Sequence, residues 1–158
     1  MEKYLGVKLV EAEPKERYKD VDYENCLLKN KQEGYKVVYP DGYESWSPKE
    51  IFEEAYRRID NLTFGLAIEA MKKGYKVARK GWNGKEMWIV LMPSLYLPPY
   101  NTADTYRKVN DRTAKHIGED KPLDSQPYIA MWTAQGKWQP GWLASQADIL
   151  AEDWMVVE

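Results

Sequence analysis

The fold of this chain is decided by residues 63–92, which read TFGLAIEAMKKGYKVARKGWNGKEMWIVLM. Four apolar residues in it recur at the i, i+3, i+4, i+7 spacing that makes one stripe along a helix. They are Phe64, Ala67, Ile68 and Met71. Thr63 or Asn61 is expected to cap this helix at its N-terminus. Gly74 is expected to end it, because glycine tolerates the left-handed conformation that often follows a helix.

A hairpin is expected directly after this helix. Residues 75–79 and 87–92 both have the composition of strands, and Asn83-Gly84 lies between them. This dipeptide is typical of tight hairpin turns, because both residues accept a positive φ. The segment therefore predicts a helix followed by two antiparallel strands.

A second hairpin and a last strand are expected towards the C-terminus. PYIAMWT (127–133) and KWQPGWL (137–143) would pair around a turn at Gln135-Gly136, and WMVVE would close the sheet. The connection between the two hairpins has a weaker pattern. We expect a helix over 102–116 there, with four apolar residues facing inward: Ala103, Tyr106, Val109 and Ile117.

The N-terminal residues predict a separate small module. Strands are expected at 3–10, 35–39 and 43–46, with a loop that holds some helix at 14–33. Ser47, Pro48 and Glu50 have the spacing of a capping box with proline at the first helical position. The helix would run to about Arg58 and bury Ile51, Phe52 and Ala55, with Trp46 and Ile51 forming a hydrophobic staple.

We therefore expect an α+β fold in two parts. Residues 1–60 would form an accessory module, with strands and a helix at 48–58. Residues 61–158 would form a small antiparallel sheet of hairpins packed against one or two helices, with an insert at 94–126. This second part is the expected ligand-binding domain.

The composition is that of a soluble globular protein. Of the 158 residues, 44% are hydrophobic and 30% charged, and no stretch approaches the length of a membrane helix. The first residues show no secretory signal, and the single cysteine, Cys26, allows no intramolecular disulfide, so a reducing cytoplasm is expected. The net charge of −2 argues against binding to duplex nucleic acid, and leaves room for a small anionic ligand.

Tryptophan is unusually frequent. There are seven, and six follow residue 80: Trp82, Trp88, Trp132, Trp138, Trp142 and Trp154. Tryptophan is favoured at interfaces and around ring-bearing ligands, because it offers a flat apolar face and one N–H donor. The alternative is that large residues fill the core of a small domain.

Little in the sequence predicts an enzyme. His116 is the only histidine, and Cys26 lies in the other module, so neither a metal cluster nor a Cys–His pair is expected. No glycine-rich phosphate loop is present. Glu152 and Asp153 are expected to be solvated charges. We expect no catalytic residue, no metal and no cofactor.

Two short segments carry candidate ligand-binding residues. The first holds Arg79, Trp82 and Asn83, which offer a donor fork, a stacking face and an amide. The alternative explanation is that Asn83-Gly84 serves only to form the turn and that Arg79 is a solvated strand residue.

The second segment holds Trp142, Ser145, Gln146 and Asp148. Ser145 would cap a short helix whose N-terminus attracts anions, although Ser145 and Asp148 can also be a plain cap. Arg107 and Arg112 are weaker candidates in the insert, with solvated arginines as the alternative.

The blocks ARKGWNGK (78–85) and WLASQADILAEDW (142–154) give a family resemblance. Together with their flanks they resemble a family of small bacteriophage proteins that includes the Thoeris anti-defence sponges. The N-terminal module, through GYKVVYPDGYESWSPKEIFEEAY (34–56), resembles an accessory unit attached to various phage proteins.

The resemblance implies a function. Such proteins bind glycocyclic ADP-ribose signals, and some bind cyclic di- or trinucleotides, without cleaving them. They do so as homo-oligomers, here expected to be a dimer or hexamer, with sites at subunit interfaces. The host's defence effector then stays inactive. This chain is accordingly expected in the cytoplasm of the infected host, away from membranes.

Two other functions fit the same residues. A protein-interaction or virion-associated module would use exposed tryptophans to bind a phage or host protein. A nucleotide-degrading enzyme would show turnover with a pH profile traceable to named acids or bases.

Overall fold

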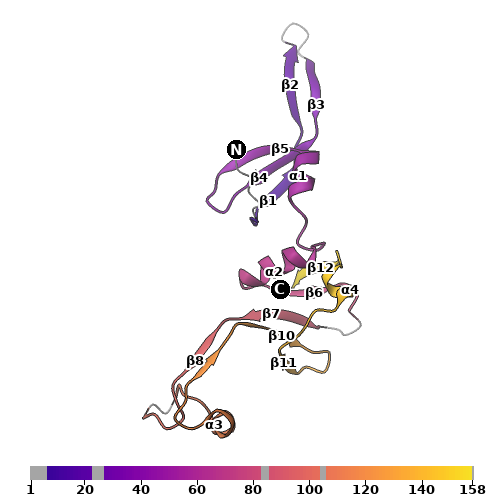
Figure 1. Ribbon diagram of the computed structural model, residues 1–158. Coiled ribbons are helices and arrows are strands. Elements are labelled where there is room, and N and C mark those ends of the chain that lie inside the picture. Colours follow the sequence, from indigo (N-terminus) through magenta and orange to yellow (C-terminus); the bar gives the residue numbers. More distant parts are fainter. Residues whose placement is uncertain (1–6, 23–26, 83–85, 104–105, 158) are drawn as a thin grey trace, which may run out of the picture. The chain divides into compact units, whose positions relative to one another are not determined.

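The computed structural model describes residues 7–22, 27–82, 86–103 and 106–157 (Figure 1). The chain forms two compact units, Met1–Arg58 and Ile59–Glu158. Both combine short helices with antiparallel strands. The expected α+β class is confirmed.

The N-terminal unit contains a three-stranded sheet, a separate hairpin and one helix (Figure 1). The sheet strands, in spatial order, are β1 Glu11–Pro14, β4 Gly34–Val38 and β5 Glu44–Pro48. The hairpin strands are β2 Arg17–Asp22 and β3 Leu27–Gln32. Helix α1, Lys49–Ala55, packs on β4 and β5.

The prediction was wrong for the described residues among the first 33. Residues 17–22 and 27–32 form the β2–β3 hairpin instead of a loop with some helix. Residues 7–10 of the expected strand 3–10 lie outside any strand, β1 begins at Glu11, and residues 3–6 and 23–26 lie outside the described residues. A 2.5 Å ion pair joins Lys31 of β3 to Glu16, which directly precedes β2. Most residues of the two strands are polar or charged, so the alternation of apolar residues that usually indicates a strand is absent from this sequence.

The predicted cap of α1 was also wrong. Ser47 pairs with Tyr35 in the sheet, and its hydroxyl donates to the Pro48 carbonyl oxygen at 3.4 Å. Strand pairing thus continues to Pro48, which becomes the N-cap, and the helix ends at Ala55 rather than Arg58. Ile51 is 59% exposed instead of buried.

Aromatic stacking replaces the expected staple. The Phe52 ring lies 4.3 Å from that of Tyr35 and 4.9 Å from that of Tyr56. Trp46 instead lies on the sheet, where its indole N–H donates to the Lys15 carbonyl oxygen.

The C-terminal unit is built on a five-stranded antiparallel sheet (Figure 1). Its strands, in spatial order, are β11 Trp138–Pro140, β10 Tyr128–Trp132, β7 Trp88–Met92, β6 Lys76–Arg79 and β12 Trp154–Val157. Helix α2, Phe64–Lys72, packs on β6, β7 and β12. The core between helix and sheet includes Met71, Val77, Ile89, Met131 and Trp154.

The helix and hairpin predictions for this unit are confirmed. The Thr63 hydroxyl accepts from the Leu66 N–H, Ala67 and Met71 are buried, and Gly74 takes a φ of +91° after the helix. The second hairpin turns with Gly136 at a φ of +67°. The Asn83-Gly84 turn lies outside the described residues.

The insert forms a ribbon and one helix. Strands β8 Leu95–Leu97 and β9 Leu123–Ser125 pair, and Figure 1 shows them running on from β7 and β10, with α3, Asp111–Ile117, at the far end. The expected start of this helix at 102 was wrong, because Asn110 caps it by accepting from the Thr113 N–H. Val109 is fully buried as expected, whereas Tyr106 is 95% exposed and Ala103 is also exposed.

None of the helices in the described ranges is long and apolar enough to span a membrane.

Candidate ligand-binding site

Arg79 at the end of β6 is held by two carboxylates of the chain itself. Its Nε donates to Asp153 Oδ1 at 2.8 Å, and its Nη1 donates to Asp148 Oδ1 at 2.9 Å. The Arg79 side chain is only 20% exposed. The guanidinium fork that the sequence offered to a ligand is therefore occupied within the protein. Asp153 is correspondingly not the solvated charge that was expected.

Asp148 joins the short helix α4, Gln146–Ile149, to strand β6. Besides Arg79, it accepts from the Ser145 backbone N–H at 3.0 Å and from the Ser145 hydroxyl at 2.6 Å. The predicted capping box is confirmed. Burial would raise the pKa of Asp148, but the hydrogen bonds from Ser145 and Arg79 outweigh it and lower the pKa to about 2.

Trp82 and Trp142 pack against the buried Trp154. Their ring centroids lie 5.4 and 6.2 Å from that of Trp154, and Phe64 contacts the same ring at 5.3 Å. Trp154 is fully buried and donates its indole N–H to the Asp148 carbonyl oxygen at 2.9 Å. We call these residues the Arg79 cluster: Arg79, Trp82, Trp142, Ser145, Asp148, Asp153 and Trp154.

The structure thus brings together five of the nine predicted ligand-binding residues: Arg79, Trp82, Trp142, Ser145 and Asp148. Gln146 is exposed in the first turn of α4, next to this cluster. Arg107 and Arg112 are exposed in the insert, with Arg112 on α3, and Asn83 lies outside the described residues. Ligand contact by any of the nine stays a prediction, and the contacts of the cluster give it a clear role in holding α4.

The charge of Asp148 should make stability depend on pH. Its folded pKa of about 2 is below the ordinary 3.8, so its stabilising contribution is present above pH 3.8 and lost as the pH falls towards 2. Urea unfolding across this range should show the loss. Asp148→Asn should lower the free energy of unfolding at neutral pH and make it depend less on pH. If the free energy of unfolding of the variant falls with pH as steeply as that of the wild type, other groups cause the pH dependence.

A second group of tryptophans lies on the sheet face opposite α2. Trp132 pairs with Trp88 on one side and Trp138 on the other, across strands β7, β10 and β11. The Trp88 and Trp132 rings stack at 5.9 Å with 10° between their planes, and Trp138 meets Trp88 edge to face at 6.0 Å. The Lys76 ammonium lies 5.6 Å above the Trp88 ring. We call Lys76, Trp88, Trp132 and Trp138 the tryptophan face.

Strand alternation explains why these rings avoid the core. Trp88 and Trp132 each adjoin a buried residue in sequence, Ile89 and Met131, which face α2. Neighbouring side chains on a strand point to opposite faces, so the tryptophans point away from the helix. Trp138 is 40% exposed. The number of tryptophans alone does not place them together, although strand alternation and the pairing of the second hairpin do predict that Trp132 and Trp138 share a face.

The tryptophan face can stack flat rings and has one cation beside them. Metal chemistry has no comparable support, since no group of three or more His, Cys, Asp or Glu within the described ranges is placed to hold an ion. His116 is exposed on α3, and Cys26 lies outside those ranges.

Comparison with known proteins singles out the C-terminal unit. Residues 62–157 match a family model described as the Thoeris anti-defense 2-like domain. A protein of Bacillus phage SP01, named Thoeris anti-defense 2, is 34% identical over 96 residues, which cover 61% of this chain and 94% of that protein. The matched residues include both the Arg79 cluster and the tryptophan face, and leave the N-terminal unit outside.

Proposed function

Because the chain belongs to the Thoeris anti-defence 2-like family, we propose that it is a phage anti-defence protein that sequesters cyclic nucleotide immune signals without cleaving them. Glycocyclic ADP-ribose isomers are the first candidates, with cyclic di- and trinucleotides next. The bound signal would no longer reach the host's defence effector, in the cytoplasm of the infected cell. The resemblance found in the sequence and the family match both support this proposal.

The tryptophan face is the observation that best supports ligand binding by this unit. Three indole rings on neighbouring strands offer stacking area for a base, and base–aromatic stacking contributes about 1–3 kcal/mol per base. Lys76 adds a positive charge at the edge of the rings. Both parts suit a ligand that combines a flat base with phosphates.

Sequestration requires binding alone, and two acids of the C-terminal unit, Asp148 and Asp153, are held in ion pairs rather than poised for proton transfer. Asp148, with a pKa lowered to about 2, is a poor proton donor at neutral pH. Asp153 is likewise held by Arg79, whose hydrogen bond lowers its pKa. We accordingly propose that the protein is not an enzyme.

Tight binding would need the ligand to be enclosed. A nanomolar dissociation constant corresponds to about 12 kcal/mol, which an open sheet face does not readily supply. We propose that a second copy of the chain covers the tryptophan face and closes the site, in a dimer or a hexamer. The part-exposed Trp138 would then lie at the subunit interface.

The proposal is tested by calorimetric titration of the full-length protein with glycocyclic ADP-ribose isomers and cyclic di- and trinucleotides. Binding of at least one of them with submicromolar affinity is expected, with linear ADP-ribose as the control of similar charge. If none binds, the family resemblance concerns the fold alone and the proposal fails.

One feature supports the alternative function of a protein-interaction module, namely exposed leucines beside α4. Leu143 and Leu150, which flank α4, are 88% and 77% exposed. Large exposed apolar side chains before and after one short helix suit a protein partner. A stable complex with a phage or host protein, without any small-molecule binding, would favour this alternative.

A further inference from the structure

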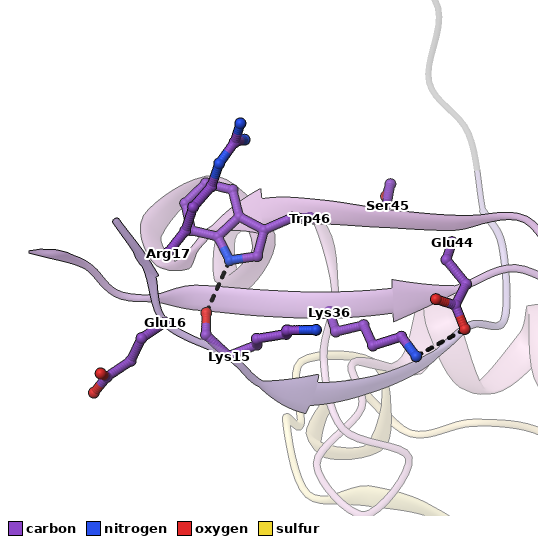
Figure 2. Close-up of a pocket in the computed structure, with 7 residues that line it drawn as sticks. All are labelled: Lys15, Glu16, Arg17, Lys36, Glu44, Ser45 and Trp46. Atoms are coloured by element: carbon purple, nitrogen blue, oxygen red, sulfur yellow. Dashed lines mark hydrogen bonds and ion pairs between the residues drawn. The ribbon is translucent and has the colours of Figure 1, made fainter. Parts of the chain in front are cut away.

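A pocket of about 340 Å³ opens in the N-terminal unit, outside the residues that match the family. Trp46, Lys36, Lys15 and Arg17 line it, together with Ser45 and two acids (Figure 2). They come from β4, β5, the segment that joins β1 to β2, and the first residue of β2. Its volume lies at the lower end of the range typical of small-molecule sites, which begins at about 300 Å³.

Trp46 is fixed in this pocket at two places. Its indole N–H donates to the Lys15 carbonyl oxygen at 2.8 Å, as Figure 2 shows. The ring also lies so close to Gly34 that a Cβ there would overlap both the ring and the Ser47 carbonyl oxygen. Glycine is therefore needed at this position for close approach, and the indole is held in place before any ligand arrives.

The two acids of the pocket are each paired with a lysine. Glu44 accepts from Lys36 at 2.7 Å, and Glu16 lies 2.5 Å from Lys31, whose hydrogen bond lowers the pKa of Glu16. Among the residues that the structure describes, no carboxylate forms an ion pair with Lys15 or Arg17. The Arg17 guanidinium lies 5.6 Å from the centre of the Trp46 ring.

The pocket thus combines a fixed aromatic ring with two cations, Lys15 and Arg17, that form no ion pair with a carboxylate in the described part of the chain. This positive charge stands out, because residues 1–60 hold 11 Lys and Arg against 14 Asp and Glu. A positive charge beside an aromatic ring suits a phosphate monoester, which carries about −1.5 to −2 at neutral pH. Arginine and lysine are the side chains that bind phosphate in most proteins.

We propose that this pocket binds a small aromatic phosphate of mononucleotide size, with its ring beside Trp46 and its phosphate on Lys15, whose ammonium points away from the Arg17 guanidinium in Figure 2. The N-terminal unit would then be a second ligand-binding part of the chain. This inference does not depend on the function proposed for the C-terminal unit, because no residue of the pocket belongs to residues 62–157.

The test uses full-length ¹⁵N-labelled protein and follows the indole N–H signal of Trp46 by NMR. That signal is assigned by its loss in Trp46→Phe. Adenosine monophosphate is the probe, and adenosine and inorganic phosphate supply the ring and the anion separately. The monophosphate should shift the Trp46 signal with a millimolar or tighter dissociation constant, and should bind at least about tenfold more tightly than either part.

Lys15→Met should weaken binding of the monophosphate about tenfold, as expected when a charge-assisted contact is removed. Lys19→Met is the matched control, because Lys19 is an exposed lysine of β2 that does not line the pocket. Its affinity should equal that of the wild type.

Three results would overturn the proposal. They are an unmoved Trp46 signal at saturating monophosphate, equal binding of adenosine or inorganic phosphate, and equal losses in Lys15→Met and Lys19→Met. Because the readout is the Trp46 signal, ligand bound to the C-terminal unit would not be mistaken for binding here.

Discussion

Arg79→Met is expected to lower the free energy of unfolding of the C-terminal unit by about 2 kcal/mol. The substitution leaves Asp148 and Asp153 without their cation, at side-chain exposures of only 14% and 32%. Removing one partner of a buried pair is costly because the other charge stays desolvated, and the partial exposure of Asp153 reduces this cost. The substitution would also remove the ion pair with Asp148 through which β6 holds α4.

Urea unfolding followed by tryptophan fluorescence measures this effect, since Trp82, Trp142 and Trp154 surround the same network. Lys80→Met is the matched control, because Lys80 is the exposed neighbour of Arg79 and should change stability little. Equal stability of the two variants would show that the Arg79 ion pairs are not structural. That result would favour the prediction from the sequence that Arg79 contacts the ligand.

Trp138→Ala is expected to weaken binding of the sequestered signal by about tenfold to a hundredfold. Trp138 is the most exposed ring of the tryptophan face, so its loss removes stacking area without emptying the core. Titration of the wild type and the variant with the same ligand gives the comparison directly.

Tyr75→Ala controls for the general loss of an exposed aromatic residue. Tyr75 is 39% exposed against 40% for Trp138 and lies outside the tryptophan face of the same unit. If Trp138→Ala binds as tightly as Tyr75→Ala, the ligand does not contact this face. The predicted residues around α4, Gln146 above all, would then be the next to replace.

Local sequence signals were enough for most of the C-terminal unit. The stripe from Phe64 to Met71 and the cap at Thr63 specify α2 without help from distant residues. Ser145 and Asp148 likewise specify the start of α4 within four residues. These signals act over one turn of helix, which is the distance at which sequence patterns are most informative.

Two of the wrong predictions share a physical cause, which is pairing between strands, whereas the start of α3 was missed although its cap at Asn110 is a local feature. Ser47 has every local feature of an N-cap, but its pairing with Tyr35 places it in a strand. The β2 and β3 strands pair through mostly polar residues, with an ion pair between Glu16 and Lys31 beside them, so no apolar periodicity predicts the hairpin.

The candidate site was limited by the same cause. Arg79 meets Asp148 and Asp153 across about 70 residues of chain, so its occupied guanidinium could not be deduced from spacing. The tryptophan face likewise exists only because β10 pairs with both β7 and β11.

We propose that the protein holds a cyclic nucleotide signal and releases it unchanged. To test this, the full-length protein is incubated with an excess of the tightest-binding glycocyclic ADP-ribose isomer, washed and denatured by heat, and the released compound is identified by chromatography and mass spectrometry. We predict recovery of the intact cyclic compound in a fixed ratio to protein, unchanged after prolonged incubation. Recovery of a linear or hydrolysed product that accumulates with time would show instead that the protein is an enzyme.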